Sequence, residues 1–241
     1  MKFTFEGYRG LITLLKQNGY NICGYDNYSD NEKTAILRHD IDFSVEKALE
    51  LASIEQEEGV SATYFVLLST DFYNVNSRKT TEGLRTLINQ GGVVGLHFDE
   101  MKYDLTSVEQ MIKMIQKEQK ILSLSLDTPI NVVSMHRPSK LVLSQNIEIP
   151  NMINSYGEEF IKGFKYVSDS RMNWREDVEQ IIKSGKHNKL HILTHAFWYQ
   201  EKEMETKDIL GKFVSDAKNE RYISISENIK NVEDFLHKED I

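Results

Sequence analysis

The chain has 241 residues, 40% of them hydrophobic and 10% aromatic, which is enough for one large domain with a substantial core. Its 37 acidic side chains outnumber its 29 basic ones and give a formal net charge of −8, which argues against binding to nucleic acid or to an anionic membrane surface. Cys23 is the single cysteine, which excludes an internal disulfide bond and a zinc site built from thiolates.

The N-terminus and the apolar runs predict a cytoplasmic protein without membrane insertion. Residues 1–6 lack the apolar core of a signal peptide, and the apolar run 64–68 is far too short to cross a bilayer. Three prolines and the absence of a Gly/Ser tract leave no obvious linker. We expect one domain over 1–241, comprising an N-terminal helix and loop (1–33), a motif-bearing barrel (34–200) and a C-terminal helical region (201–241).

Predicted helices and strands alternate along the chain, after a first helix and a polar loop at 21–33. The expected helices span 4–19, 45–58, 81–90, 106–122, 151–162 and 175–184, and the expected strands span 34–37, 62–68, 93–97, 131–136, 164–169 and 191–195. From residue 201 the chain looks largely helical, with a break at 222–225 left open. Alternation of this kind is typical of a mostly parallel sheet, open or closed into a barrel, whose carboxyl strand ends gather on one face.

The segment Leu37-Arg38-His39-Asp40-Ile41-Asp42 lies where the first of these strands passes into a helix. Asp40 and Asp42 are two residues apart, so they share one face if the strand continues that far. Two carboxylates held so close favour a cation or a proton between them, and a carboxylate beside a metal-bound water can act as a general base. The alternative is that both aspartates cap the helix and that His39 packs locally.

Other strand ends carry the same residue types. His39, His97, His136 and His195 are four of the seven histidines, and all four fall at predicted strand ends, as does Asp169. Packing does not require such an arrangement, so it favours a metal or acid–base site. Histidine and aspartate together suit zinc or a similar first-row divalent ion with an open position for water, which indicates hydrolysis.

The sequence lacks the motifs that two other types of site would require. The sequence contains no Gly-x-Ser-x-Gly elbow of a serine hydrolase and no Gly-x-x-x-x-Gly-Lys loop for phosphates.

Five segments in order resemble the motifs of the polysaccharide deacetylase family (carbohydrate esterase family 4, NodB-like), and more closely its intracellular branch associated with surface-polysaccharide biosynthesis. The segments are 38–42, 95–97, 136–138, 168–170 and 193–195, and 59–65 is similar to the family's Gly-Val-x-Ala-Thr-Phe-Phe strand. The resemblance covers roughly residues 37–198. It implies an α/β fold, a distorted TIM-like (β/α) barrel of about seven parallel strands, and a metal-dependent N-deacetylase acting on an N-acetylated sugar, a polysaccharide precursor or a nucleotide-linked sugar.

The resemblance also implies a role for each matching residue. Asp40 would be the general base, with Arg137 holding its carboxylate. His195 would be the general acid that protonates the leaving amine. Asp169 and Trp174 would fall in the motif that supports and walls the site.

By the same resemblance, Asp42 and His97 would be metal ligands. The family usually supplies a second histidine four residues after the first, and that position here is Met101, a poor ligand for hard or borderline metals. We therefore expect His136 to be the third ligand, with His39 or Asp99 as alternatives. Zinc is the expected metal, and cobalt, nickel and manganese are the other candidates.

The substrate is expected to be a small molecule or a carbohydrate, and the oligomeric state is left open. Phe98 and Trp198 are candidates to stack on a sugar ring, with packing as the alternative. Two other functions stay open beside sugar deacetylation. One is hydrolysis of a non-sugar linear amide or ureide at the same site, and the other is a catalytically silent barrel that binds a sugar or a protein.

Overall fold

The computed structural model describes residues 1–29 and 32–241 of the chain. The contacts divide these residues into two compact units, 1–201 and 202–241. The second unit contains the long helix α8 (Thr206–Asn228) and the short helices η3 (Val232–Asp234) and η4 (Lys238–Asp240). Among the described residues, no helix is both long and apolar enough to span a membrane. The assignment of 1–241 to one domain stays a prediction.

The first unit is built from parallel strands and the helices that connect them. Its strands are β1 (Asn21–Cys23), β2 (Thr34–Ile41), β3 (Thr63–Leu67), β4 (Val93–Phe98), β5 (Val132–Met135), β6 (Ile153–Asn154), β7 (Lys165–Ser168) and β8 (Lys189–Thr194). Its helices are α1 (Phe5–Gln17), α2 (Val45–Glu58), α3 (Arg78–Asn89), η1 (Glu100–Lys102), α4 (Val108–Leu126), α5 (Lys140–Ser144), α6 (Glu158–Gly163), α7 (Val178–Ser184) and η2 (Ala196–Trp198).

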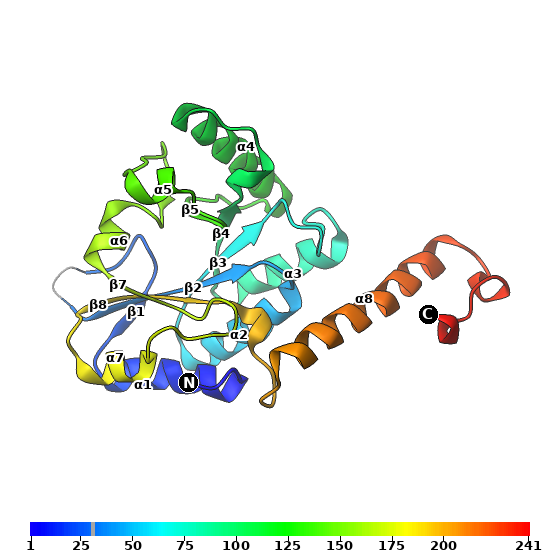
Figure 1. Cartoon of the computed structure of the whole chain (residues 1–241), viewed down its shortest axis with the longest axis horizontal. Helices are drawn as coiled ribbons and strands as arrows, with labels where there is room; N and C mark the ends of the chain where they lie inside the picture. The colour runs from blue at the N-terminus through cyan, green and yellow to red at the C-terminus, as the bar shows by residue number, and fades with distance from the viewer. Residues whose placement is uncertain (30–31) are drawn as a thin grey trace. The chain divides into compact units, whose positions relative to one another are not determined.

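Seven strands form one curled sheet in the order β6-β5-β4-β3-β2-β8-β7, and β1 adds to β2 beside this path (Figure 1). Every described strand pair is parallel. The curl is deep enough for Arg38 of β2 to donate to Ser134 of β5, three strands away in the sheet. No pairing between β6 and β7 is described, so the barrel is open on that side. The predicted distorted (β/α) barrel of about seven parallel strands is confirmed.

Two local expectations are wrong, and the structure answers one question about helix continuity that the sequence left open. Residues 21–23 form strand β1 rather than a loop, because they pair with 34–36 of β2. The helix expected at 151–162 is shorter, since 153–154 pairs with β5 as β6 and the helix begins only after Gly157. Helix α8 continues through 222–225 without a break. In the first two cases pairing in the folded sheet overrides local propensity.

Strand β2 is an interior strand of the sheet, and all eight of its residues are buried. It pairs with β3 on one side and β8 on the other. Three of its buried residues are nevertheless ionisable: Arg38, His39 and Asp40. Because successive side chains of a strand point to opposite faces, Arg38 and Asp40 share one face while His39 lies on the other. Burying such groups is costly unless each has a partner.

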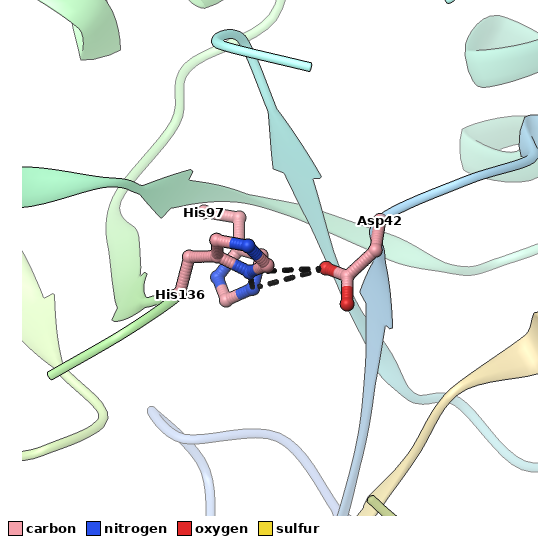
Figure 2. Close-up of side chains that lie close together, drawn as sticks. All are labelled: Asp42, His97 and His136. Carbon is pink, nitrogen blue, oxygen red and sulfur yellow. Dashed lines mark hydrogen bonds and ion pairs between the residues drawn. The ribbon is translucent and has the colours of Figure 1, made fainter. Parts of the chain in front are cut away.

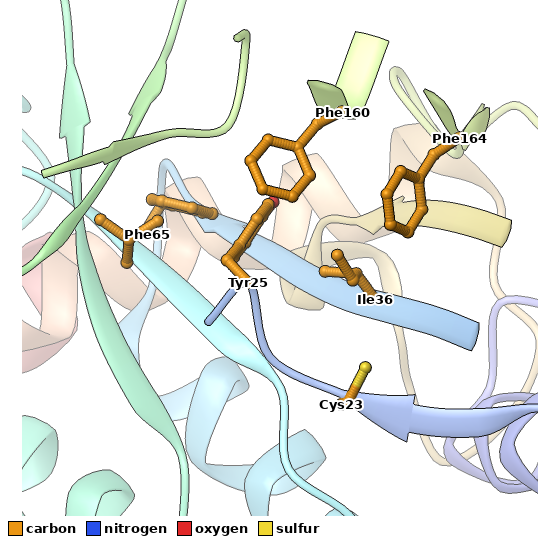
Figure 3. Close-up of a cluster of buried hydrophobic side chains, with 7 residues drawn as sticks. Cys23, Tyr25, Ile36, Phe65, Phe160 and Phe164 are labelled. Carbon is orange, nitrogen blue, oxygen red and sulfur yellow. The ribbon is translucent and has the colours of Figure 1, made fainter. Parts of the chain in front are cut away.

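An aromatic cluster fills the barrel interior beneath Arg38 (Figure 3). The rings of Tyr25 and Phe160 meet edge to face at 5.0 Å, and Tyr25 also lies 6.0 Å from Phe65. The Arg38 guanidinium lies 4.9 Å from the Phe65 ring centroid. Glycine is required at Gly95 on β4, since a Cβ there would lie 2.7 Å from the Phe65 ring. The cluster therefore forms an apolar floor under the charged residues at the strand ends.

His39 belongs to a buried network on the opposite face of β2. Its Nε2 lies 2.7 Å from Glu55 of α2, which also accepts hydrogen bonds from the hydroxyls of Tyr8 and Tyr64. Its Nδ1 is hydrogen-bonded to Thr194 at the end of β8. His39 is thus turned away from the other strand-end histidines, which corrects its place as an alternative metal ligand. The network ties β2 to α1, α2, β3 and β8.

Removing the carboxylate of Glu55 tests the importance of this network. Glu55→Ala deprives three buried partners, Tyr8, Tyr64 and His39, of their shared acceptor. We expect the free energy of unfolding to fall by about 3–5 kcal/mol, since unpaired buried polar groups carry their full desolvation cost. Urea denaturation followed by circular dichroism measures the change.

The matched control is Glu50→Ala, which removes an exposed glutamate from the same helix. Its stability is expected to stay close to that of the unaltered protein. Equal losses for the two variants would show that the Glu55 network does not stabilise the barrel.

Candidate metal centre and catalytic residues

The carboxyl ends of four strands supply the candidate site. Asp40 is the next-to-last residue of β2, and Asp42 directly follows that strand. His97 lies near the end of β4. His136 follows β5 directly, and His195 follows β8. Because all these strands are parallel and the sheet is curled, their ends meet on one face.

Three side chains converge on one point, Asp42, His97 and His136 (Figure 2). Asp42 Oδ1 lies 3.3 Å from both His97 Nε2 and His136 Nδ1. The two ring nitrogens lie 3.1 Å from each other. These are the residues that the sequence analysis assigned to the metal, with His136 as the third ligand.

The pKa values of Asp42 and His136 are shifted by the contact between these two side chains. Burial alone raises the pKa of Asp42, but the imidazoles of His136 and His97, each 3.3 Å from Asp42 Oδ1, outweigh burial and hold the pKa far below its ordinary value. Burial lowers the pKa of His136, and Asp42 more than compensates, so the pKa of His136 is raised. Asp42 is therefore an anion at neutral pH, as a metal ligand must be.

The spacing of these atoms fits a divalent metal. Tetrahedral coordination with bonds of about 2.0–2.1 Å separates neighbouring ligand atoms by about 3.3 Å, and the three distances here are 3.3, 3.3 and 3.1 Å. Asp42 Oδ1 is also a buried acceptor that makes no conventional hydrogen bond with any of the described residues. Met101, by contrast, is 70% exposed on η1. The donor set suits zinc and similar ions.

Asp40 lies beside this cluster and is held by Arg38. Arg38 Nη2 donates to Asp40 Oδ1 and Oδ2 at 2.8 and 2.7 Å, and Nε donates to Oδ1 at 3.2 Å. Burial alone raises the pKa of Asp40, but the adjacent guanidinium outweighs it and the pKa is lowered. Asp40 Oδ2 is 3.4 Å from His97 Nε2, so an ionised carboxylate lies next to the metal cluster.

His195 also lies close to this cluster and is supported by Asp169. Its Nδ1 is 2.7 Å from Asp169 Oδ1, and its backbone N–H donates to the same carboxylate. The Tyr199 hydroxyl donates to Asp169 Oδ2 at 3.1 Å. Burial lowers the pKa of His195, but the hydrogen bond and charge of Asp169 raise it to about 9. His195 Nε2 faces Asp42 Oδ2 at 3.9 Å.

Arg137 does not hold Asp40, contrary to the expectation from the family motifs. Its guanidinium pairs with Asp99 instead. Arg137 follows β5 at the rim and its side chain is 59% exposed, whereas Arg38 is in the same strand as Asp40 and shares its face. The signal for Arg38 was present in the sequence, because residues at i and i+2 of a strand lie side by side.

Two of the three aromatic candidates, Phe98 and Trp198, are buried, whereas Trp174 is partly exposed. Phe98 is 1% exposed and stacks on Tyr103, because it follows His97 in β4 and points to the opposite face. Trp198 is 8% exposed and packs edge to face on Phe197. These contacts correct both predictions of sugar stacking. Trp174 is partly exposed, and its Nε1 is buried without a partner among the described residues.

A cavity of about 510 Å³ adjoins Asp40, His136 and His195. It runs along the open side of the barrel between the β6 and β7 edges. Polar and aromatic side chains line it beyond the reactive residues, among them Ser155, Tyr156, Tyr166, Ser168, Ser170 and Arg175. Cavities of this size class take small molecules or parts of larger ones.

Solved structures with a similar chain path are carbohydrate esterases of family 4 and related deacetylases, the family that the sequence motifs resemble. A family 4 carbohydrate esterase from Bacillus anthracis is 16% identical, with 86% of this chain and 84% of that chain covered and a TM-score of 0.44. The peptidoglycan deacetylase PdaC from Bacillus subtilis is 17% identical, with 81% and 98% covered and a TM-score of 0.42.

A family 4 pseudoenzyme from Bacillus anthracis is also similar, at 13% identity, 80% coverage of this chain and a TM-score of 0.44. This chain spans less than two thirds of that pseudoenzyme and of its mutant with restored activity, 63% and 65% of their lengths. No protein-family model and no curated protein sequence matches the chain. The function is therefore argued from the residues of this chain.

Zinc titration of metal-free protein tests the ligand set. His136→Ala removes one of three converging donors, and we expect zinc affinity to fall by more than about 100-fold. Loss of a residue that only hydrogen-bonds to a metal ligand typically costs about 10–100-fold. Isothermal titration calorimetry measures the dissociation constant.

Two controls accompany this variant. His187→Ala removes a histidine remote from the cluster, and Met101→Leu removes the exposed thioether at the position of the family's usual histidine. Both are expected to bind zinc as the unaltered protein does. The ligand set is wrong if Met101→Leu weakens zinc binding or if His136→Ala leaves it unchanged.

Proposed function

We propose that the chain is a metal-dependent hydrolase, an N-deacetylase that removes the acetyl group from an N-acetylated sugar, a polysaccharide precursor or a nucleotide-linked sugar. The observation that carries the proposal is the juxtaposition of three groups. A cluster of metal-ligating atoms lies next to an arginine-held carboxylate and an aspartate-held histidine. These are the parts that metal-assisted amide hydrolysis needs.

Asp42, His97 and His136 would hold the metal. When bound, a divalent ion such as zinc supplies Lewis-acid polarisation of the amide carbonyl. The burial of Asp42 and His97 limits competition from water for these ligands.

Asp40 is proposed as the general base. Its lowered pKa keeps it ionised at neutral pH, and both of its oxygens are fixed by Arg38. Asp40 lines the cavity, so a water molecule there can pass a proton to it as the oxygen attacks the amide carbon.

His195 is proposed as the general acid. The hydrogen bond to Asp169 fixes its ring and holds it protonated at neutral pH, so its Nε2 can donate a proton to the departing nitrogen. Breaking the C–N bond then yields a neutral amine and acetate rather than an amide anion. Asp40 and His195 both line the cavity, which allows the proton-accepting and proton-donating steps to act on one bound amide.

The base role is tested with Asp40→Asn. Amine release from N-acetylglucosamine and its nucleotide-linked form is expected to fall by about 10²–10⁴-fold, the usual contribution of general base catalysis. Zinc affinity is expected to stay unchanged, because Asp42 and the two histidines remain. A fluorogenic amine assay and zinc titration give the two readouts.

Asp42→Asn is the matched comparison, since it should lose zinc binding and activity together. If Asp40→Asn retains activity, Asp40 is not the base. If the unaltered protein binds no divalent metal and zinc, cobalt or nickel gives no turnover on either substrate, the proposed hydrolase function is wrong.

The acid role is tested by changing the leaving group. His195→Ala is expected to slow hydrolysis of the N-acetyl sugar by about 10²–10⁴-fold, since an amine leaves poorly without a proton. Hydrolysis of 4-nitrophenyl acetate should fall much less, because its phenolate leaves unprotonated. Equal losses on the two substrates would contradict the role of His195 as the acid.

A further inference from the structure

Two arginines form ion pairs with aspartates beside the candidate metal ligands, and the two pairs differ in their surroundings. Arg38 is on β2 inside the barrel and contacts Asp40. Arg137 follows β5 at the rim and contacts Asp99. Their surroundings indicate what each of them positions.

Arg38 is almost fully buried, at 1% exposure, and its donors are directed to fixed acceptors. Besides its bonds to both oxygens of Asp40, its Nη1 donates to Ser155 at 3.2 Å and its Nη2 to Ser134. Ser134 is in β5 and Ser155 follows β6, so the far wall of the barrel anchors the guanidinium. The planar fork leaves the Asp40 carboxylate little freedom to rotate.

Arg137 is part of a tie between the loops after β4 and β5. Its partner Asp99 is 7% exposed and caps η1 by accepting from the Met101 N–H at 3.1 Å. The His136 N–H donates to the Phe98 carbonyl at 2.9 Å, and the Ser139 N–H donates to Glu100.

These contacts are made by His136 itself and by the residues that follow it, Arg137 and Ser139. They join its loop to the residues that directly follow His97. The 3.1 Å separation of the two ring nitrogens therefore depends on this tie.

We propose that Arg38 positions the base Asp40, and that Arg137, through Asp99, positions the metal ligand His136. The inference rests on the proposed function for the roles of Asp40 and His136. It reassigns the role that the family motifs give to Arg137. Histidine ligands depend on fixed surroundings for their orientation, and altering such partners typically costs 10–100-fold in metal affinity or activity.

The two arginines are separated by measuring zinc affinity, kcat and KM on the full chain. Arg137→Ala is expected to weaken zinc binding by about 10–100-fold and to recover kcat near the original value at saturating zinc. Arg38→Lys keeps the charge but loses the fork. It is expected to lower kcat by about 10–100-fold, with KM and zinc affinity unchanged.

A double variant and chemical rescue with guanidinium test the roles of Arg137 and Arg38 more specifically. Asp99→Asn should weaken zinc binding as Arg137→Ala does, and the double variant should be no weaker than either single one, because both act through one contact. Free guanidinium should restore part of the kcat of Arg38→Ala, since Arg38 lines the cavity. Arg78→Ala, at an exposed pair on α3, is the control and should change neither quantity.

Opposite results overturn the inference. It is wrong if Arg137→Ala loses kcat at saturating zinc with its zinc affinity intact, or if Arg38→Lys retains the original kcat. Additive losses in zinc affinity for Asp99→Asn and Arg137→Ala would also reject the Arg137 tie. If the unaltered protein releases no amine, the proposed function fails, whereas the zinc affinities still decide what Arg137 positions.

Discussion

Two carboxylates two residues apart at the end of β2 set the main constraint on this structure. Asp40 and Asp42 repel each other in a buried setting, so each requires its own compensation. The Arg38 guanidinium pairs with Asp40, the ring nitrogens of His97 and His136 lie beside Asp42, and His97 Nε2 lies near both carboxylates. The arginine distinguishes the two carboxylates, so that Asp40 is proposed as the acceptor of protons and Asp42 as the metal ligand.

The sheet makes this arrangement possible. Its curl brings β5 and the end of β6 within reach of Arg38, and it brings His136 against His97. On the opposite face of β2, Glu55 and His39 connect the strand that carries Asp40 to Thr194, the neighbour of His195. The same strand is therefore fixed on both faces, and the proposed base and acid are held in register by one buried network. Catalytic groups need this kind of fixed support to act together.

The sequence predicted the features that depend on periodicity and order along the chain. The alternation of strands and helices predicted a mostly parallel sheet with its carboxyl strand ends on one face. The family motifs predicted the barrel and the ligands Asp42 and His97, and His136 was inferred as the third ligand in place of Met101. The sequence-based prediction failed where the contacts of a residue depend on the face of the strand on which it lies. His39 has the same residue type and place as the other histidines but falls on the opposite face, and Phe98 is buried for the same reason. The partner of Asp40 was assigned to Arg137 by motif, although strand geometry already placed Arg38 beside it.

The central claim is that Asp42 after β2, His97 near the end of β4 and His136 after β5 form one metal site. Anomalous diffraction at the zinc edge, from crystals of the Asp40→Asn variant soaked in zinc, tests it most directly. We expect one strong peak about 2.0–2.2 Å from Asp42 Oδ1, His97 Nε2 and His136 Nδ1. A zinc ion bound elsewhere with this cluster empty, or one coordinated without His136, would contradict the account.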